Sequence, residues 1–421
     1  MSLAGPRSAY LHIPFCYQRC FYCDFVVVPL GNYPKIENNK NSSLIKSYLD
    51  ILRREISASP KGPPLSTVYI GGGTPSLLSP LEISLLLDDL RNHFGIQEGA
   101  EVSLEIDPAS FDKDDLLGFI EAGITRVSLG AQSFSDSILK QLGRKHSRKE
   151  LMESCNWIDD CYKQGRLFSW SLDLIQSLPG QDLVSWQDQL DQAIKTSSPH
   201  LSVYELSIEP GTVFAWQKSK GQLKLPDEDL SAEILRLTSS SLKSAGFSRY
   251  EVSNYSLPGH CSRHNRVYWS GSGWWGFGQG ATSSPWGKRF TRPKSAKEYQ
   301  IWVDKQQEEY SDSSLLPSNS IPVELDDQIL VGLRRREGVD MNCLALNYGW
   351  SQKEFEEYFS LLLVRWDVAI NSGWLVCNGT RCFLTDPEGM DFSNQVLIQM
   401  LLWWDSLPCN SDLRPNLEEL E

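Results

Sequence analysis

The sequence contains the stretch Tyr10-Leu11-His12-Ile13-Pro14-Phe15-Cys16-Tyr17-Gln18-Arg19-Cys20-Phe21-Tyr22-Cys23-Asp24-Phe25, in which three thiols directly follow a strand-like run. Iron-sulfur clusters are normally held by four cysteines, so Cys16, Cys20 and Cys23 would ligate three irons of a cubane and leave the fourth iron open. Chance spacing and a zinc site are the alternatives. Structural zinc sites usually close on four ligands from paired CxxC units, and no partner pair lies nearby. The spacing therefore predicts a [4Fe-4S] cluster.

Short β-rich runs alternate with amphipathic helical stretches along the first half of the chain, which is typical of βα units around a parallel sheet. One such helix is predicted over 112–122, with Gly123 as its C-terminal stop. Six units predict an α/β fold with a partial (β/α)6 barrel, whose ligands lie at the C-terminal strand ends. The predicted strands are 10–13, 67–70, 102–106, 126–129, 169–175 and 201–206.

The composition along the chain predicts a core over 1–245, an extension over 246–310 packed on the core, a linker over 311–322 and a C-terminal module over 323–421. The linker is rich in Ser, Pro and Asn. In the module, helices are predicted over 325–336 and 352–371. A hairpin over 374–384 turns at Asn378-Gly379. Helices and a terminal hairpin indicate a small winged-helix-like module, for which we expect a packing or lid role.

The charge and hydropathy of the chain restrict its partners and its compartment. A net charge of -13 over 421 residues disfavours nucleic-acid binding, which needs a basic stripe. No apolar run is long enough to span a membrane, and residues 1–10 lack a secretory apolar region, so we expect a cytoplasmic protein. Scattered cysteines in a reducing compartment usually act as small buried apolar residues. These are Cys155, Cys161, Cys261, Cys343, Cys377, Cys382 and Cys409.

The cysteine stretch resembles the radical S-adenosylmethionine (SAM) superfamily, and within it the coproporphyrinogen-oxidase-like group that begins YxHIPFC. The motif Gly71-Gly72-Gly73-Thr74-Pro75-Ser76 follows the second predicted strand and resembles the GGGTPS motif that lies against SAM. Glycines let backbone groups approach a ligand closely at a strand end. The resemblance implies that SAM chelates the open iron through its amine and carboxylate, and that the cluster and SAM are the cofactors.

Further residues that match family positions around SAM occur at or just beyond the predicted strands. Buried charges at strand ends are costly unless they are paired, so a ligand site is favoured there over a simple salt bridge. For Arg144 the alternative is a solvated helix end. The resemblance implies SAM contacts for Tyr10, Tyr22, Gly72, Gly73, Thr74, Glu105, Gln132, Arg144 and Asp173.

The group contains two activities: an oxygen-independent coproporphyrinogen III oxidase, which decarboxylates propionates, and a HemW-like haem chaperone. Phe25 stands where the oxidases carry a fourth cysteine, and only 15 residues precede Cys16. The run His264-Asn265-Arg266-Val267-Tyr268-Trp269 resembles the HNxxYW motif of the chaperone branch, and the matching run 276–281 follows it. These features favour the chaperone. Radical chemistry on an unrelated substrate is a third and weaker alternative.

A chaperone of this kind would bind haem and pass it to an acceptor protein, which the sequence does not identify, nor does it identify the electron donor. Histidine is a standard axial ligand of haem iron, which makes His264 the haem candidate. Alternatively, His264 is hydrogen-bonded inside the barrel, and His260 and Cys261 are rival ligands. The flat apolar wall of such a site is predicted from Tyr268, Trp269, Trp274 and Trp275.

Overall fold

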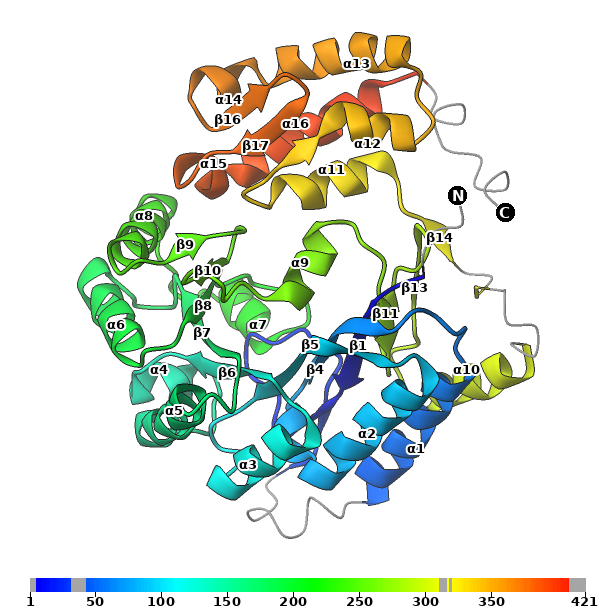
Figure 1. Cartoon of the computed structure of the whole chain (residues 1–421). Helices are drawn as coiled ribbons and strands as arrows, with labels where there is room; N and C mark the ends of the chain where they lie inside the picture. Colours follow the sequence, from blue (N-terminus) through cyan, green and yellow to red (C-terminus); the bar gives the residue numbers. More distant parts are fainter. Residues whose placement is uncertain (1–4, 32–42, 310–315, 318–319, 409–421) are drawn as a thin grey trace.

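The computed structural model describes residues 5–31, 43–309, 316–317 and 320–408, and its centre is a curled nine-stranded sheet (Figure 1). The strand order is β11-β1-β4-β5-β6-β7-β8-β10-β9. The six predicted strands form its parallel middle, each paired with the next along the chain, which confirms the α/β prediction. They are β1 Ser8–Ile13, β4 Leu65–Gly72, β5 Ile96–Ile106, β6 Arg126–Gln132, β7 Ser169–Gln176 and β8 His200–Glu205.

The extension over 246–310, which we expected to pack on the core, instead contributes strands to both edges of the main sheet. Strand β11, Trp275–Phe277, pairs parallel with β1. On the other side a hairpin of β9, Ser248–Arg249, and β10, Asn254–Ser256, pairs antiparallel with β8. The strands β9, β10 and β11 are short and do not belong to a regular alternation of strands and helices. The sequence pattern therefore did not predict them as strands of the main sheet.

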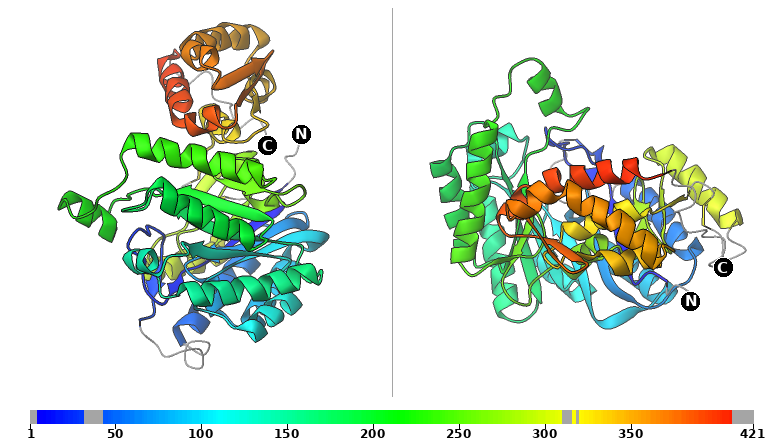
Figure 2. Two further views of the ribbon diagram at one scale, coloured as in Figure 1. Left: turned by 90° about the vertical axis from the view of Figure 1, so that its left-hand side faces the viewer. Right: turned by 90° about the horizontal axis from the view of Figure 1, so that it is seen from above.

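The two faces of the sheet differ in polarity because side chains alternate along each strand. On β4, Val68 and Ile70 pack in the main core, whereas Thr67 and Tyr69 point to the concave interior. Helices cover the convex face (Figures 1 and 2). The polar residues are therefore collected on the inner side, where a ligand can reach them.

The covering helices follow their strands as βα units. Helix α3 begins after Asp112, whose side chain forms a capping box with Asp115, and it ends at Gly123 with φ of 116°, as predicted. The helices of the core are α1 Ser43–Ala58, α2 Pro80–His93, α3 Lys113–Ala122, α4 Asp136–Gln141, α5 Arg148–Lys163, α6 Leu183–Lys195, α7 Val213–Ser219, α8 Glu228–Ser244, α9 Arg263–Trp269 and α10 Ala296–Glu309.

Besides the sheet of the C-terminal module, the described residues form two small sheets outside the main one. Strand β2, Phe15–Cys16, pairs with β3, Val28–Pro29. In the second, β13, Lys288–Thr291, lies between β12, Thr282–Ser283, and β14, Ile321–Pro322. The predicted linker is thus incorrect at its end, because β14 is paired rather than free. Most of its other residues lie outside the described residues.

The C-terminal module has its own hydrophobic core around Trp366, Leu333 and Met400. Its sheet has the order β15-β17-β16, and the predicted hairpin is present, with Gly379 at φ of 62°. Its strands are β15 Val339–Asp340, β16 Leu375–Asn378 and β17 Arg381–Leu384. Its helices are α11 Leu325–Leu333, α12 Met341–Asn347, α13 Gln352–Arg365, α14 Asp367–Asn371, α15 Glu388–Asp391 and α16 Ser393–Ser406.

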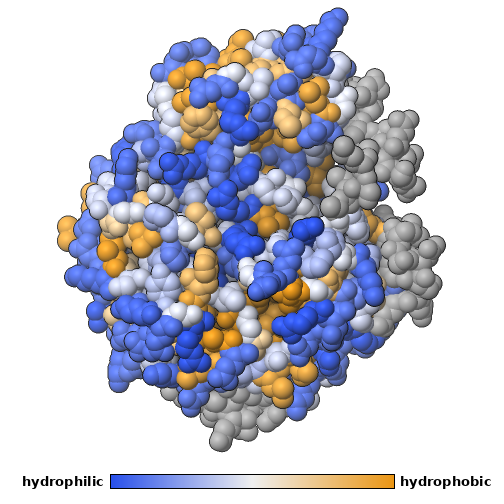
Figure 3. All heavy atoms as spheres, in the orientation of Figure 1, coloured by the Kyte–Doolittle hydropathy of each residue, from blue (hydrophilic) through white to orange (hydrophobic). Residues whose placement is uncertain are grey.

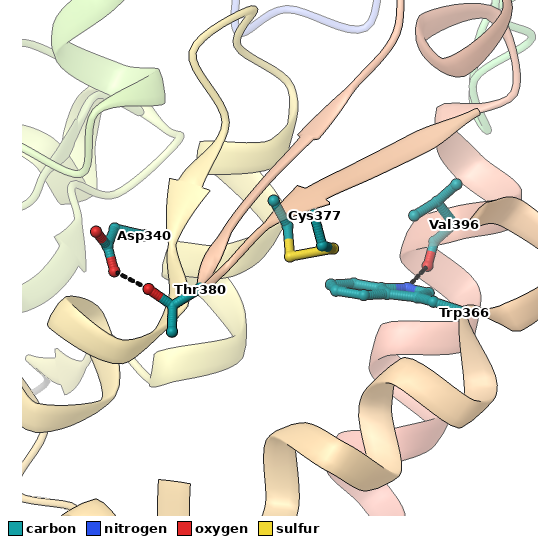
Figure 4. The surroundings of a disulfide bond; sticks show 6 residues. Asp340, Trp366, Cys377, Thr380 and Val396 are labelled. Carbon is teal, nitrogen blue, oxygen red and sulfur yellow. Dashed lines mark hydrogen bonds between the residues drawn. A yellow bond between two sulfur atoms is a disulfide. The ribbon is translucent and has the colours of Figure 1, made fainter. Parts of the chain in front are cut away.

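Two of the scattered cysteines are joined, which corrects the expectation that all of them are simple buried residues. Cys377 and Cys382 face each other across the β16–β17 hairpin and form a disulfide (Figure 4). Cys343 is exposed, whereas Cys155 and Cys161 are buried as expected. Cys409 lies outside the described residues.

The module packs over α9 and the β9–β10 hairpin, above the gap between the two edges of the curled sheet (Figures 1 and 2). The buried guanidinium of Arg249 donates to Asp391 at 2.7 Å, and Arg266 pairs with Glu337 at 2.6 Å. The face seen in Figure 3 mixes hydrophilic and hydrophobic residues in small patches. None of the helices in the described ranges has the length and apolar character needed to traverse a bilayer.

Candidate functional site

A cavity of about 430 Å³ opens at the C-terminal ends of strands β4 to β8, where parallel βα folds bind ligands. Its lining combines the cysteine loop with the inner residues of those strands. No residue of the C-terminal module is part of the described lining. Eleven of the predicted site residues line it: Cys16, Cys20, Tyr22, Cys23, Gly72, Gly73, Thr74, Glu105, Gln132, Arg144 and Asp173.

The cysteine loop is held by backbone hydrogen bonds on both sides. The N–H of Leu30 donates to the carbonyl of Cys16 at 2.7 Å, and the N–H of Phe21 donates to the carbonyl of Leu142 at 3.0 Å. Cys16 is buried, while Cys20 and Cys23 are half-buried. The three thiols therefore sit on a fixed loop that faces the cavity.

The thiols fit a cluster better than a single ion. Among the residues that the structure describes, no three His, Cys, Asp or Glu side chains converge as a mononuclear metal site requires. Thiolates that bind separate corners of a cubane need no common point. Burial raises the pKa of Cys16 to about 12, although a hydrogen bond from Thr74 opposes this. Cluster assembly must therefore displace a proton from Cys16.

The glycines of the GGGTPS motif are required by close packing. A Cβ on Gly73 would lie 2.7 Å from Cys16 Sγ and 2.6 Å from the carbonyl oxygen of Phe15. Gly72 has φ of 121°, which side chains disfavour. The motif thus lets β4 end directly against the cysteine loop.

Glu105 is fixed at the centre of the cavity wall. Its Oε2 accepts from the N–H of Gly72 at 2.9 Å, and its Oε1 accepts from the hydroxyl of Tyr69 at 2.9 Å. Burial raises its pKa to about 7, and these hydrogen bonds only partly oppose that. Near neutral pH the carboxyl group can therefore exchange a proton or gain a cationic partner.

Arg144 connects the cysteine loop to the strand ends. Its guanidinium pairs with Asp107, donates to the carbonyl of Gly130 at 2.9 Å and lies 3.6 Å from Cys20 Sγ. Burial lowers the pKa of Arg144, but Asp107, Tyr22 and Cys20 together more than offset this effect and raise the pKa. The guanidinium remains charged beside the cluster loop, so Arg144 is not a solvated helix end.

Several polar atoms in the cavity wall lack a partner. The buried Gln132 Oε1, Asp173 Oδ1 and Arg144 Nε make no hydrogen bond. The backbone of Gln132 has a φ of 59°, so it departs from regular strand geometry at the end of β6. Asp173 Oδ2 accepts from Ser128 Oγ at 2.8 Å. Buried groups of this kind are normally satisfied, so these atoms fit a polar ligand such as SAM.

Tyr10 does not line the cavity. Its ring stacks behind Tyr69 at 6.2 Å, and its hydroxyl lies 2.9 Å from His12 Nδ1. Sequence reasoning missed Tyr69, Asp107 and Tyr204, which do line it. Tyr69 and Tyr204 occupy inward-facing positions of β4 and β8, and the alternation of side chains along these two strands is the sequence signal that could have identified them.

His264 lies deeper in the barrel than the cavity, on α9. Its Nδ1 is 2.9 Å from Thr67 Oγ1 and its Nε2 is 2.9 Å from the hydroxyl of Tyr268. Glu101 accepts from its backbone N–H at 2.9 Å, and burial lowers the pKa of the ring to about 3. Both ring nitrogens are occupied, so the structure argues against His264 as the axial haem ligand.

The rival haem ligands lie nearer the surface but also outside the cavity lining. His260 Nδ1 is 3.1 Å from Ser169 Oγ, and its Nε2 is 3.3 Å from the hydroxyl of Tyr162. Cys261 Sγ is 3.2 Å from Ser256 Oγ. The geometry brings neither residue to the cysteine loop.

Comparisons with known proteins agree with this site. Residues 10–181 match the radical SAM superfamily. The chain is 37% identical to the "Heme chaperone HemW" of Synechocystis, over 93% of this chain and 95% of that protein. It is 30% identical to the mitochondrial "Radical S-adenosyl methionine domain-containing protein 1" of Danio rerio, over 80% and 75% of the two chains.

A solved structure shares the whole architecture. The coproporphyrinogen III oxidase HemN of Escherichia coli superposes with a TM-score of 0.76 over 94% of this chain and 90% of that chain. At 22% identity this likeness shows the fold alone. Since the relatives match over nearly the full length, the chain belongs to the radical SAM superfamily, and within it to the HemW family.

Proposed function

We propose that the protein is a haem chaperone on a radical SAM scaffold, which binds haem, a [4Fe-4S] cluster and SAM and passes haem to an acceptor protein. The observation that carries the proposal is the near full-length match to a protein named heme chaperone. The proposal places the protein in the cytoplasm, and its haem acceptor is unknown.

The cofactor part of the proposal rests on the cavity. Cys16, Cys20 and Cys23 would hold the cluster, which supplies one electron to a bound sulfonium when reduced. Gly72, Gly73, Thr74, Tyr22, Glu105, Gln132, Arg144 and Asp173 would contact SAM. In the protein itself, Arg144 keeps a positive charge at the loop, and Glu105 offers an acceptor fixed by Gly72 and Tyr69. Tyr10 would act only by supporting the ring of Tyr69.

The absence of a fourth cysteine favours a chaperone over an oxidase. Phe25 takes that position, lines the cavity and is 56% exposed at its rim. An exposed aromatic ring there suits contact with a flat apolar ligand or a partner protein. The oxidase remains the alternative function, supported only by the shared fold.

The discriminating experiment uses the reconstituted protein under anaerobic conditions. In one arm it receives haem, and the bound haem is quantified by absorbance after gel filtration. In the other it receives coproporphyrinogen III, SAM and a reductant, and the products are separated chromatographically. We expect stoichiometric haem binding and no decarboxylated product. Turnover of coproporphyrinogen, or no retained haem, would overturn the proposal.

A further inference from the structure

The disulfide of the C-terminal module joins two cysteines that the proposed function does not use. Cys377 on β16 and Cys382 on β17 face each other directly across the hairpin (Figure 4). We propose that this pair is a thiol–disulfide exchange site for a small redox protein that carries two reactive thiols, and that its redox state sets how firmly the module is held on the core. This inference goes beyond the haem-chaperone function, because the site lies outside the cavity lining.

The disulfide contributes little as a structural link. Its two cysteines are only five positions apart, and closing so short a loop removes little entropy from the unfolded chain. The strands are already paired through four positions, and the module has its own hydrophobic core. In a reducing cytoplasm, the compartment proposed for the protein, disulfides are rare and usually redox-active. A reversible role therefore suits this bond better than a structural one.

The two sulfur-bearing residues differ in access. Cys382 is fully buried in the module core. Cys377 is half-buried and is followed by the turn residues Asn378 and Gly379, which are exposed. Exchange requires a thiolate to reach one sulfur of the bond. The incoming thiolate would therefore attack Sγ of Cys377.

The two thiols of the partner balance the exchange. One partner thiolate bonds to Cys377 Sγ, and the bond to Cys382 breaks with its electrons on Cys382 Sγ, which takes up a proton. The second partner thiolate attacks the partner sulfur of the mixed disulfide and releases Cys377 as a thiolate, which is also protonated. The hairpin thus gains two electrons and two protons, and the partner becomes a disulfide. An oxidised partner reverses these steps.

Reduction requires the module core to rearrange. The disulfide lies on the side of the hairpin that faces Trp366, within the same buried cluster (Figure 4). Two thiols need more room than a bonded pair of sulfurs, and closely packed interiors have little room to spare. Opening the bond would therefore shift β17 relative to β16.

A shift of β17 reaches the core of the protein because Cys382 lies against the segment that joins the module to α9. Cys382 pairs with Val339 of β15, and a Cβ on Gly338 would overlap the carbonyl oxygen of Cys382. The preceding residue, Glu337, pairs with Arg266 of α9 at 2.6 Å. The disulfide is thus coupled through the backbone to an ion pair between the module and the core.

The same segment makes the backbone contacts between the module and the β9–β10 hairpin. The N–H of Val252 donates to the carbonyl of Arg334 at 3.2 Å, and the N–H of Arg336 donates to the carbonyl of Tyr250 at 3.1 Å. Residues 334–337 are therefore bound to the core, while the residues that follow them are bound to β17. The reduced hairpin should hold this segment less firmly.

The first measurement tests the exchange itself. The full-length, cluster-loaded protein is incubated anaerobically with a bacterial thioredoxin, either oxidised or kept reduced by its reductase and NADPH. Free thiols are alkylated, and the peptides are analysed by mass spectrometry. We expect Cys377 and Cys382 to be linked in the first sample and alkylated in the second. Cys343, which is exposed and forms no disulfide, should be alkylated in both.

The second measurement tests the consequence. Amide hydrogen exchange reports local opening, and we expect it to be severalfold faster over 334–340 and α9 in the reduced protein. Cys377→Ser leaves the buried Cys382 in place and should give the faster exchange with either form of thioredoxin. Cys343→Ser is the matched control and should keep the dependence on redox state.

The unaltered chain provides the main comparison, so the result does not depend on whether a variant folds. Cysteines 377 and 382 that stay linked, or stay alkylated, in both samples would overturn the exchange site. Equal hydrogen exchange over 334–340 in the two redox states would overturn the coupling to the core. Neither measurement involves haem, so failure here leaves the haem-chaperone test unaffected.

Discussion

Glu105 receives a hydrogen bond from the backbone N–H of Gly72 at 2.9 Å, which joins the third strand of the barrel to the glycine motif of the second. The two residues belong to motifs that lie 33 positions apart in the sequence. The bond fixes the carboxylate at the cavity wall, close to where Gly73 contacts the cysteine loop. The two motifs thus form one surface.

The buried position of Glu105 makes stability depend on pH. Its pKa is 4.5 in the unfolded chain and about 7 in the folded protein. Between these values the folded protein keeps a proton that the unfolded chain has lost, so stability falls as pH rises, by about 3 kcal/mol in total. Glu105→Gln should remove this fall. Urea unfolding of the cluster-free protein at about pH 5 and about pH 8 tests it; an identical pH dependence in both proteins would contradict the assignment.

Gly73→Ala should dislodge the cysteine loop. The added methyl group would overlap Cys16 Sγ and two backbone carbonyls. We expect a loss of about 1–3 kcal/mol in stability and a reduced iron content after reconstitution. Gly62→Ala is the matched control, because its Cβ meets nothing closer than 3.7 Å. Iron and sulfide analysis with visible absorbance measures the result, and full cluster content in Gly73→Ala would refute the prediction.

Arg144 and Asp107 should be energetically coupled. Arg144→Met leaves the Asp107 carboxylate without its cation, and breaking such a pair costs about 3 kcal/mol. The double variant Arg144→Met/Asp107→Leu should recover part of that loss, since neither charge remains. Unfolding of the cluster-free proteins in a double-mutant cycle gives the coupling energy. Additive effects would show that the pair is not coupled.

His264→Leu should lower stability without changing haem affinity. The substitution removes the hydrogen bonds to Thr67 and Tyr268 inside the barrel, at a cost of about 1–3 kcal/mol. Haem titration of the folded fraction should match that of the unaltered protein. His260→Leu is the comparison, since that ring lies nearer the surface. A loss of haem affinity specific to His264→Leu would restore it as a ligand.

Much of the site was predictable because its chemistry lies at strand ends. Carboxylates such as Glu105 and Asp173 stand out against the apolar strands that carry them, and the thiols have diagnostic spacing. Tyr69 did not stand out, because a tyrosine within an apolar strand is typical of a core. Its role emerges only from the curvature of the sheet, which aims it at Glu105.

Other features depend on register, which the sequence pattern does not specify. Cys377 and Cys382 become partners because the hairpin places them directly opposite each other. Ile321 looked like part of a linker because nothing in its neighbourhood indicated that β13 would pair with it. His264 carried a plausible chemical role, yet Thr67, nearly 200 positions away, supplies its actual contact.

The placement of α9 has a consequence for how the cavity is reached. Because this helix fills the barrel interior around Thr67 and Glu101, a ligand reaches the cavity from the side of the cysteine loop. SAM would therefore enter and leave by the same route.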